Sequence, residues 1–181
     1  MKNILIILAD GFEEVEALVP IDVLRRCSFN VVVSGLDKKE ITSTHNIKIS
    51  CDDILDNQKN NEFDCVVLPG GMPGTLNLGN SKDVCDLVIR HYENNKLVCA
   101  ICAAPSILEK LGLLEDKKAT SYPTFLNSDT TIKLDEKVVK DENIITSKGA
   151  GTAFDFAYKI AESLGADVEN LKASMMFKEG N

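Results

Sequence analysis

The chain has 181 residues, of which 44% are hydrophobic and 27% charged, and its formal net charge is −8. This composition is typical of a globular protein and excludes intrinsic disorder, and the length predicts a single domain over residues 1–181. The negative charge argues against a specific nucleic-acid partner or an anionic membrane partner, because both require basic residues to neutralise phosphates.

The first apolar run, Ile4–Ala9, is too short for the core of a signal peptide. No other run approaches the ~20 apolar residues that span a bilayer. The six cysteines are scattered and mostly lie in apolar runs. We therefore expect a cytoplasmic protein with no membrane anchor, whose cysteines are reduced and buried rather than joined in disulfides.

Apolar runs bounded by polar turns predict strands, and in chain order they are Asn3–Leu8, Phe29–Ser34, Asp64–Leu68, Leu97–Ile101, Ile132–Val139 and Ile144–Thr146. The looser alternation over Ile41–Ser50 predicts an edge strand or ribbon.

Helical periodicity predicts a helix over Glu13–Arg26 that is kinked or broken at Pro20, and further helices lie between the later strands. They are Ser81–Glu93 with Ser81 as its cap, a helix after Cys102 closed by Gly112, a helix to Leu164 with Thr152 and Asp155 as a capping box, and Val168–Ala173. This alternation predicts an α/β sandwich with a mostly parallel sheet and helices on both faces. Sites in such sheets lie beyond the carboxyl ends of the strands, here near Asp10, Leu68, Ile101 and Thr146.

Cys102 lies where a buried strand ends and a helix begins. Pro105 suits the first turn of that helix, and the small residues Ala100 and Ala104 suit the tight turn that carries a nucleophile. Backbone N–H groups at the start of the helix would stabilise a thiolate and lower the pKa of Cys102.

Two other interpretations of Cys102 remain open. It is equally compatible with a buried structural thiol beside a sharp turn. The spacing Cys99-x-x-Cys102 also matches a redox dithiol, but strand alternation sends the two side chains to opposite faces, which argues against it.

A nucleophilic cysteine usually needs a proton acceptor. His45 is expected in a turn and His91 on the surface, and neither is at a strand end. No metal site is expected, because the two histidines lack a cysteine or carboxylate at ligand spacing. Glu16 follows the first strand, between Val15 and Ala17, and is by itself most simply a solvated helix residue.

Four segments together resemble the DJ-1/PfpI (ThiJ) superfamily, and most closely its DJ-1-like branch. They are ILADGFEEVEALVPIDVLRR at 7–26, VVLPGGMPG at 66–74, CAICAAPSIL at 99–108 and ITSKGAGTAFDFA at 145–157. The resemblance spans nearly the whole chain. It implies a flavodoxin-like three-layer sandwich and a homodimer, with the first helix, including Arg25 and Arg26, at or near the interface. We expect no cofactor.

The resemblance also implies roles for individual residues. Cys102 would be the nucleophile and Glu16 its carboxyl partner, and backbone N–H groups around Gly70, Gly71 and Ala103 would form an anion-binding pocket. Supporting roles would fall to Arg26 and Tyr122.

Two positions depart from related sequences. Ala103 occupies the place of a histidine in the PfpI-type branch, which makes an intracellular protease or amidase the less favoured function. Tyr122-Pro123 occupies the place of a His-Pro in some DJ-1-like members, and a tyrosine with a pKa of ~10 is a poor base near neutral pH.

The function we expect is a cysteine-dependent enzyme acting on small α-oxoaldehydes such as methylglyoxal, as a glutathione-independent glyoxalase or a deglycase, and thus a lyase or hydrolase. Its reactive state would share one proton, with Glu16 protonated and Cys102 a thiolate. The alternative is an oxidative-stress sensor or redox-regulated chaperone in which Cys102 is oxidised to a sulfinate. A nucleotide-binding module is disfavoured, because Gly70-Gly71-x-x-Gly74 and Gly149-x-Gly151 do not complete the dinucleotide fingerprint.

Overall fold

A seven-stranded sheet forms the centre of the computed structural model, which describes residues 1–178. Its strands are β1 (Asn3–Leu8), β2 (Asn30–Gly35), β5 (Asp53–Ile54), β6 (Cys65–Leu68), β7 (Leu97–Ile101), β10 (Val138–Asp141) and β11 (Ile144–Ser147). They are arranged in the order β10-β11-β7-β6-β1-β2-β5, and only the edge strand β10 runs antiparallel to its neighbour. The mostly parallel sheet predicted from the sequence is confirmed.

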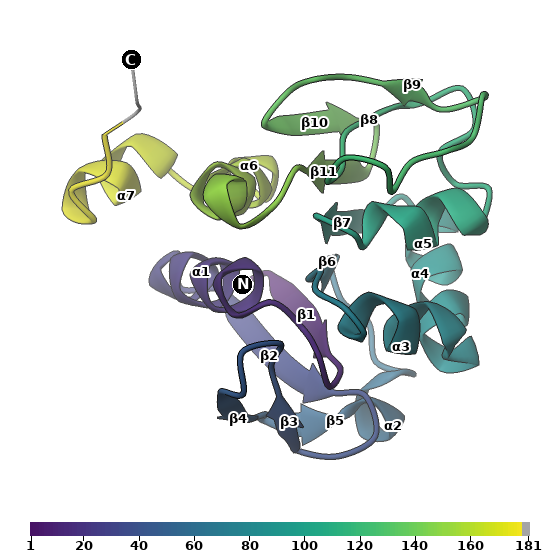
Figure 1. Cartoon of the computed structure of the whole chain (residues 1–181). Helices are drawn as coiled ribbons and strands as arrows, with labels where there is room; N and C mark the ends of the chain where they lie inside the picture. Colours follow the sequence, from purple (N-terminus) through teal and green to yellow (C-terminus); the bar gives the residue numbers. More distant parts are fainter. Residues whose placement is uncertain (179–181) are drawn as a thin grey trace.

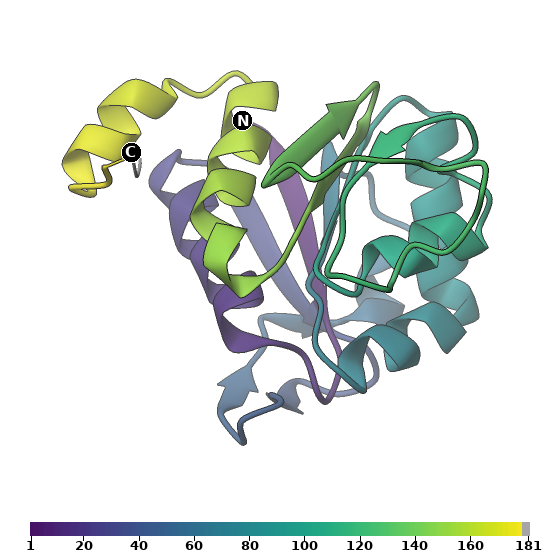
Figure 2. The same cartoon turned by 45° about the horizontal axis from the view of Figure 1, so that its top comes forward.

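Helices cover both faces of this sheet, as Figures 1 and 2 show. They are α1 (Glu14–Arg26), α2 (Leu55–Gln58), α3 (Gly74–Asn80), α4 (Lys82–Glu93), α5 (Pro105–Lys110), the 3₁₀ turn Ala150–Thr152, α6 (Ala153–Ser163) and α7 (Val168–Ser174). α1 and α6 pack on one face, and α3, α4 and α5 lie on the other (Figure 1). Within residues 1–178, none of the helices has the length and apolar character needed to cross a membrane.

The central strand β1 shows why its sequence is continuously apolar. Its residues alternate between two cores: Ile4, Ile6 and Leu8 face α1 and α6, and Leu5 and Ile7 face the opposite layer. All five are fully buried, as expected of a parallel strand covered on both faces.

Two small ribbons lie outside the main sheet. The antiparallel pair β3 (Glu40–Thr42) and β4 (Lys48–Ser50) confirms the ribbon expected over Ile41–Ser50. The strand predicted over Ile132–Val139 is wrong, because β9 (Ile132–Lys133), which pairs with β8 (Lys118–Ala119), is separated from β10 by the exposed residues 135–137.

Several local details also differ from the sequence predictions. α1 continues through Pro20, so the break that was predicted as an alternative to a kink is absent. Thr152 does not cap α6, because its hydroxyl donates to the carbonyl of Gly149 at 2.9 Å, so the predicted capping box is wrong. Ser81 does cap α4 by accepting the N–H of Val84.

The two histidines have contrasting environments. His91 is only 4% exposed, so the predicted surface position is wrong; its Nδ1–H donates to the carbonyl of Leu87 at 2.8 Å, whereas Nε2 has no partner. His45 lies in the loop between β3 and β4, as predicted for a turn residue, with Nδ1 2.8 Å from Glu14.

These environments predict opposite effects of pH on stability. Burial lowers the pKa of His91, so below ~6.5 the unfolded chain binds a proton that the folded chain excludes, and stability falls. The hydrogen bond to Glu14 raises the pKa of His45, so its stabilisation is present below ~6.5 and is lost as pH rises. The free energy of unfolding should be measured in urea at pH 7.5 and pH 5.5. Between these two values, we expect the stability of His91→Phe to fall less than that of wild type, and the stability of His45→Gln to fall more. A wild-type acid response in His91→Phe would contradict the first expectation.

Candidate functional site

Cys102 occupies the sharp turn between β7 and α5. Its φ of +64° is in the left-handed region, which non-glycine residues adopt at an energetic cost. Hydrogen bonds from neighbouring segments hold the turn: the N–H of Cys102 donates to the carbonyl of Ser147, and the N–H of Tyr122 donates to the carbonyl of Cys102, both at 2.9 Å. The strand-to-helix turn predicted from the sequence is therefore present and strained.

This turn also determines which way the sulfur points. Cys99 and Ile101 face the layer of α1 and α6, so regular alternation would send Cys102 to the other layer. The left-handed turn instead brings Cys102 back against the core beneath α1, so the expectation that Cys99 and Cys102 face opposite sides is wrong. Cys99 is fully buried, with its sulfur 3.6 Å from that of Cys65.

Glu16 lies in the first turn of α1 and points inward. Its N–H is capped by Oε2 of Glu13 at 2.8 Å, which fixes the start of the helix. The residue is only 1% exposed, so it is not a solvated helix residue. Its Oε2 accepts the N–H of Gly70 at 3.0 Å, and its carboxyl group is hydrogen-bonded to the Cys102 thiol and to the N–H of Ala150.

Two glycines allow this close approach. A Cβ on Gly70 would lie 2.6 Å from both Cys102 Cβ and Glu16 Oε2. Gly71 has φ +90°, and a Cβ there would lie 2.4 Å from the nitrogen of Glu13. Any side chain at either position would therefore push apart the segments that form the site.

The electrostatics of the pair are dominated by burial. Burial raises the pKa of Glu16 to about 7, and the charge of Glu13 adds to the effect, whereas hydrogen bonds from Cys102 and Gly70 oppose it. Burial, followed by the charge and hydrogen bond of Glu16, raises the pKa of Cys102 to about 12. The N–H groups of Gly71 and Ala103 lower it, as expected from the sequence, but they are outweighed.

Glu16 and Cys102 therefore compete for one proton. When the carboxyl is ionised, its charge keeps the proton on sulfur. When the carboxyl is protonated, two of the three causes that raise the pKa of Cys102 disappear, leaving the N–H groups of Gly71 and Ala103 to stabilise the thiolate.

The two residues with expected supporting roles have different positions. Tyr122 borders the site, and its ring packs edge-on against Phe125 with centroids 6.2 Å apart. Arg26 lies at the opposite end of α1 from Glu16, ~15 Å along the helix axis at 1.5 Å per residue. It is paired there with Asp22 at 2.9 Å, so within this chain it is not part of the Cys102 site.

Within residues 1–178, one cluster has the composition of a metal site: Glu13, Glu14 and His45 have ligand atoms within 4.8 Å of one another. Sequence spacing did not indicate it, because the ribbon brings together Glu14 and His45 from positions 31 residues apart. Buried Glu14 already accepts hydrogen bonds from Ser43 Oγ and from the N–H of His45. These hydrogen bonds explain the cluster as a structural connection between the β3–β4 ribbon and α1.

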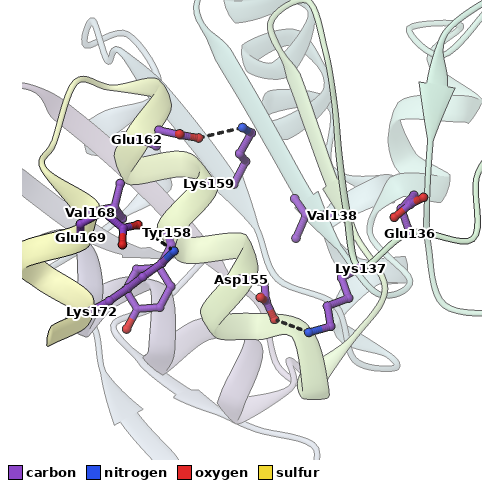
Figure 3. Close-up of a pocket in the computed structure, with 10 residues that line it drawn as sticks. All are labelled: Glu136, Lys137, Val138, Asp155, Tyr158, Lys159, Glu162, Val168, Glu169 and Lys172. Carbon is purple, nitrogen blue, oxygen red and sulfur yellow. Dashed lines mark hydrogen bonds and ion pairs between the residues drawn. The ribbon is translucent and has the colours of Figure 1, made fainter. Parts of the chain in front are cut away.

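A separate hollow of about 440 Å³ lies between α6, α7 and the segment leading into β10 (Figure 3). Its walls carry charges of both signs, including the pairs Lys137–Asp155 at 3.7 Å and Lys159–Glu162 at 2.7 Å. None of the residues that line it contributes to the Cys102 site.

The end of β11 contributes more to the site than the sequence analysis recognised. Ser147 supplies a carbonyl to Cys102, Ala150 supplies an N–H to Glu16, and Gly149 lies beside both side chains. The rule that sites lie beyond the ends of parallel strands pointed to this segment at Thr146, but not to these individual atoms.

Comparisons with known proteins agree with this geometry. The sequence profile described as "DJ-1/PfpI family" matches residues 2–163. The Drosophila melanogaster protein dj-1beta is 43% identical over 167 residues, covering 90% of this chain and 89% of the relative. The Caenorhabditis elegans protein named glutathione-independent glyoxalase DJR-1.2 is 34% identical, covering 90% and 89%. The crystal structure of Drosophila melanogaster DJ-1beta superposes with a TM-score of 0.94 at 39% identity, covering 98% and 99%. The flavodoxin-like α/β fold is confirmed, and the chain belongs to the DJ-1/PfpI family.

Proposed function

We propose that this protein is a glutathione-independent glyoxalase that converts small α-oxoaldehydes such as methylglyoxal to 2-hydroxy acids. The observation that carries the proposal is the Cys102 thiol hydrogen-bonded to a buried carboxyl whose pKa is raised to about 7. Backbone N–H groups beside the sulfur add a site for an oxyanion. The glyoxalase name of the nematode relative supports the choice of substrate class.

The chemistry needs no group beyond these residues and water. As the Cys102 proton passes to Glu16, the sulfur attacks the aldehyde carbon, and the resulting oxyanion is held by the N–H groups of Gly71 and Ala103. After Glu16 returns that proton to the oxyanion, it removes the hydrogen on the same carbon and delivers it to the neighbouring ketone carbon. The hydroxyl proton passes at the same time from the first oxygen to the ketone oxygen, so the first carbon becomes the carbonyl of a thioester of lactate. Water then cleaves the thioester, releasing lactate and restoring the Cys102 thiol.

Removal of either partner should abolish this activity. We expect Cys102→Ser and Glu16→Gln each to lower kcat/KM for methylglyoxal at least ~100-fold, the typical contribution of one acid–base group. Cys85→Ser is the matched control, because Cys85 is partly buried away from the site. Lactate should be quantified directly as the product.

The pH dependence checks the assigned roles in the same assay. Below pH ~7 both groups hold their protons, so activity should rise through an apparent pKa near 7 as Glu16 becomes able to accept the Cys102 proton. Residual activity of Glu16→Gln should lack this inflection. Full methylglyoxal turnover in both site variants would refute the proposed function.

A second candidate function is redox sensing, and the same geometry favours it. Peroxide would convert the Cys102 thiolate to a sulfenic acid with loss of hydroxide, and a second peroxide would give the sulfinic acid and water. The N–H groups of Gly71 and Ala103 and a protonated Glu16 could hydrogen-bond the sulfinate oxygens. All six cysteines are free thiols, which is compatible with the reducing cytoplasm that we also propose.

Mass spectrometry after mild peroxide treatment distinguishes this candidate. We expect two oxygens to be added at Cys102, with no comparable change at Cys27 or Cys85, which are also partly buried. Glu16→Gln keeps a neutral hydrogen-bonding group and should still accumulate the sulfinate. Oxidation spread evenly over these three cysteines would exclude a sensing role for Cys102.

We also propose that the protein forms a homodimer through α1. This helix and the adjoining ribbon expose the apolar residues Val15, Leu18 and Ile47, each 39–48% accessible. Such exposed apolar groups on one side of a molecule are typical of an interface.

Sedimentation should therefore give about twice the chain mass of 19.8 kDa. Leu18→Glu should shift the protein towards monomer, because a carboxylate would be buried at the interface. Leu76→Glu is the matched control on α3, which lies on the other face of the sheet. A monomeric wild type would exclude the dimer, and equal dissociation of both variants would exclude α1 as its interface.

A further inference from the structure

Gly149 differs from the other glycines of the site because its backbone does not require glycine. Its φ of 165° and ψ of −168° are extended, a conformation open to any residue. Gly70 and Gly71, by contrast, are needed because a Cβ would clash with fixed atoms. The absence of a side chain at Gly149 therefore leaves space, rather than relieving strain or collision.

The space lies directly beside the reacting groups. A Cβ at Gly149 would be 4.0 Å from Cys102 Sγ, 3.8 Å from Glu16 Oε1 and 3.6 Å from Cδ2 of Tyr122. These are ordinary contact distances, so one carbon atom fits there while touching the sulfur, the carboxyl oxygen and the tyrosine ring together. No other glycine described in residues 1–178 has such a set of neighbours.

We propose that Gly149 is a specificity-determining residue, whose missing side chain provides the space for the dicarbonyl carbons of the substrate. This inference rests on the proposed function. Reacting atoms approach to about 3–3.5 Å before bond formation, so a carbon in this space needs to move less than ~1 Å towards the sulfur. The same carbon lies next to the carboxyl oxygen that moves the proton between the two substrate carbons.

Tyr122 gives this space an apolar wall. Its ring is edge-on to Phe125 and 53% exposed, so it leads from the sulfur towards solvent. The substituent on the ketone carbon would lie along the ring as it leaves the site. The geometry selects α-oxoaldehydes with a small or flat substituent, such as methylglyoxal and phenylglyoxal, and excludes a bulky branched one.

Gly149→Ala tests the inference, because the added methyl group fills the space at normal contact distances without backbone strain. Gly151→Ala is the matched control in the same segment, because a Cβ at Gly151 meets nothing within 4 Å. We expect Gly149→Ala to lower kcat/KM for methylglyoxal about 100-fold, the effect of a ~1 Å misplacement. Gly151→Ala should stay within twofold of wild type.

A second readout does not depend on turnover. Alkylation of Cys102 by iodoacetamide, followed by mass spectrometry, also requires a carbon beside the sulfur, and it should slow at least tenfold in Gly149→Ala only. The inference would be overturned if Cys102 in Gly149→Ala is alkylated at the wild-type rate. It would also be overturned if alkylation of Gly149→Ala is slowed but its turnover of methylglyoxal is unchanged. If the wild type shows no methylglyoxal turnover but Gly149→Ala still slows alkylation, the glyoxalase proposal is refuted. The inference that Gly149 leaves space beside the sulfur would then still hold.

The wild-type protein provides a measurement that does not depend on the folding of a variant. We expect kcat/KM for tert-butylglyoxal to be at least tenfold below that for phenylglyoxal, because only the flat substituent can lie along Tyr122. Tyr122→Ala should reduce this difference. Equal values for the two substrates in the wild type would overturn the assigned substrate class.

Discussion

The contact between the Glu16 carboxyl and the Cys102 thiol is the interaction on which the rest of the site depends. Glu16 is buried and Cys102 is partly buried against it, so neither group can ionise without changing the pKa of the other. The surrounding structure serves to hold them together: Glu13 caps the helix that carries the carboxyl, and Gly70 permits contact with it. The left-handed turn at Cys102 directs the sulfur towards α1.

The parallel sheet makes this contact possible by ending three neighbouring strands at one edge. β6 and β7 are in register at Leu68 and Ala100, and β11 and β7 at Ser147 and Ile101. The segments that follow these strands, which contain Gly70 and Gly71, Cys102, and Gly149, are consequently neighbours although they are far apart in sequence. A long-range site of this kind requires only that each strand end in the correct short turn.

The fold and the strand-to-helix turn at Cys102 could be predicted because their signals are local. Continuous apolar runs marked the central strands, and the small residues around Cys102 marked its turn. Glu16 was identified from the family resemblance, because nothing in the local sequence indicated that it is buried. Its immediate neighbours suggested a solvated helix residue, and its contacts with Gly70, Cys102 and Ala150, in the turns after β6, β7 and β11, were not visible in the local sequence. The alternation rule placed Cys102 on the wrong face, because it assumes extended backbone and cannot anticipate a φ of +64°.

The predictions for His91 and Thr152 were wrong for a related reason. The sequence predicted that His91 lies on the surface, but packing buries the side chain and leaves Nε2 without a partner. Thr152 had a suitable sequence for a cap, but its hydroxyl bonds the backbone of Gly149 instead. In both cases the local sequence was compatible with two arrangements, and a long-range or competing contact determined which one formed.

A buried carboxyl, and not a histidine, is the titratable neighbour of Cys102. Neither histidine reaches the site, and a carboxyl with a pKa of about 7 titrates in the range where imidazole normally would. Folding therefore raises the pKa of Glu16, so the folded state binds the proton more tightly and loses stability as pH rises from ~4.5 to ~7. At about 1.4 kcal/mol per pKa unit, the ionised carboxylate costs on the order of 3 kcal/mol. This cost already includes the opposing effect of the N–H groups of Gly70 and Ala150, so the rest of the fold, chiefly the two cores on either side of β1, must compensate for it.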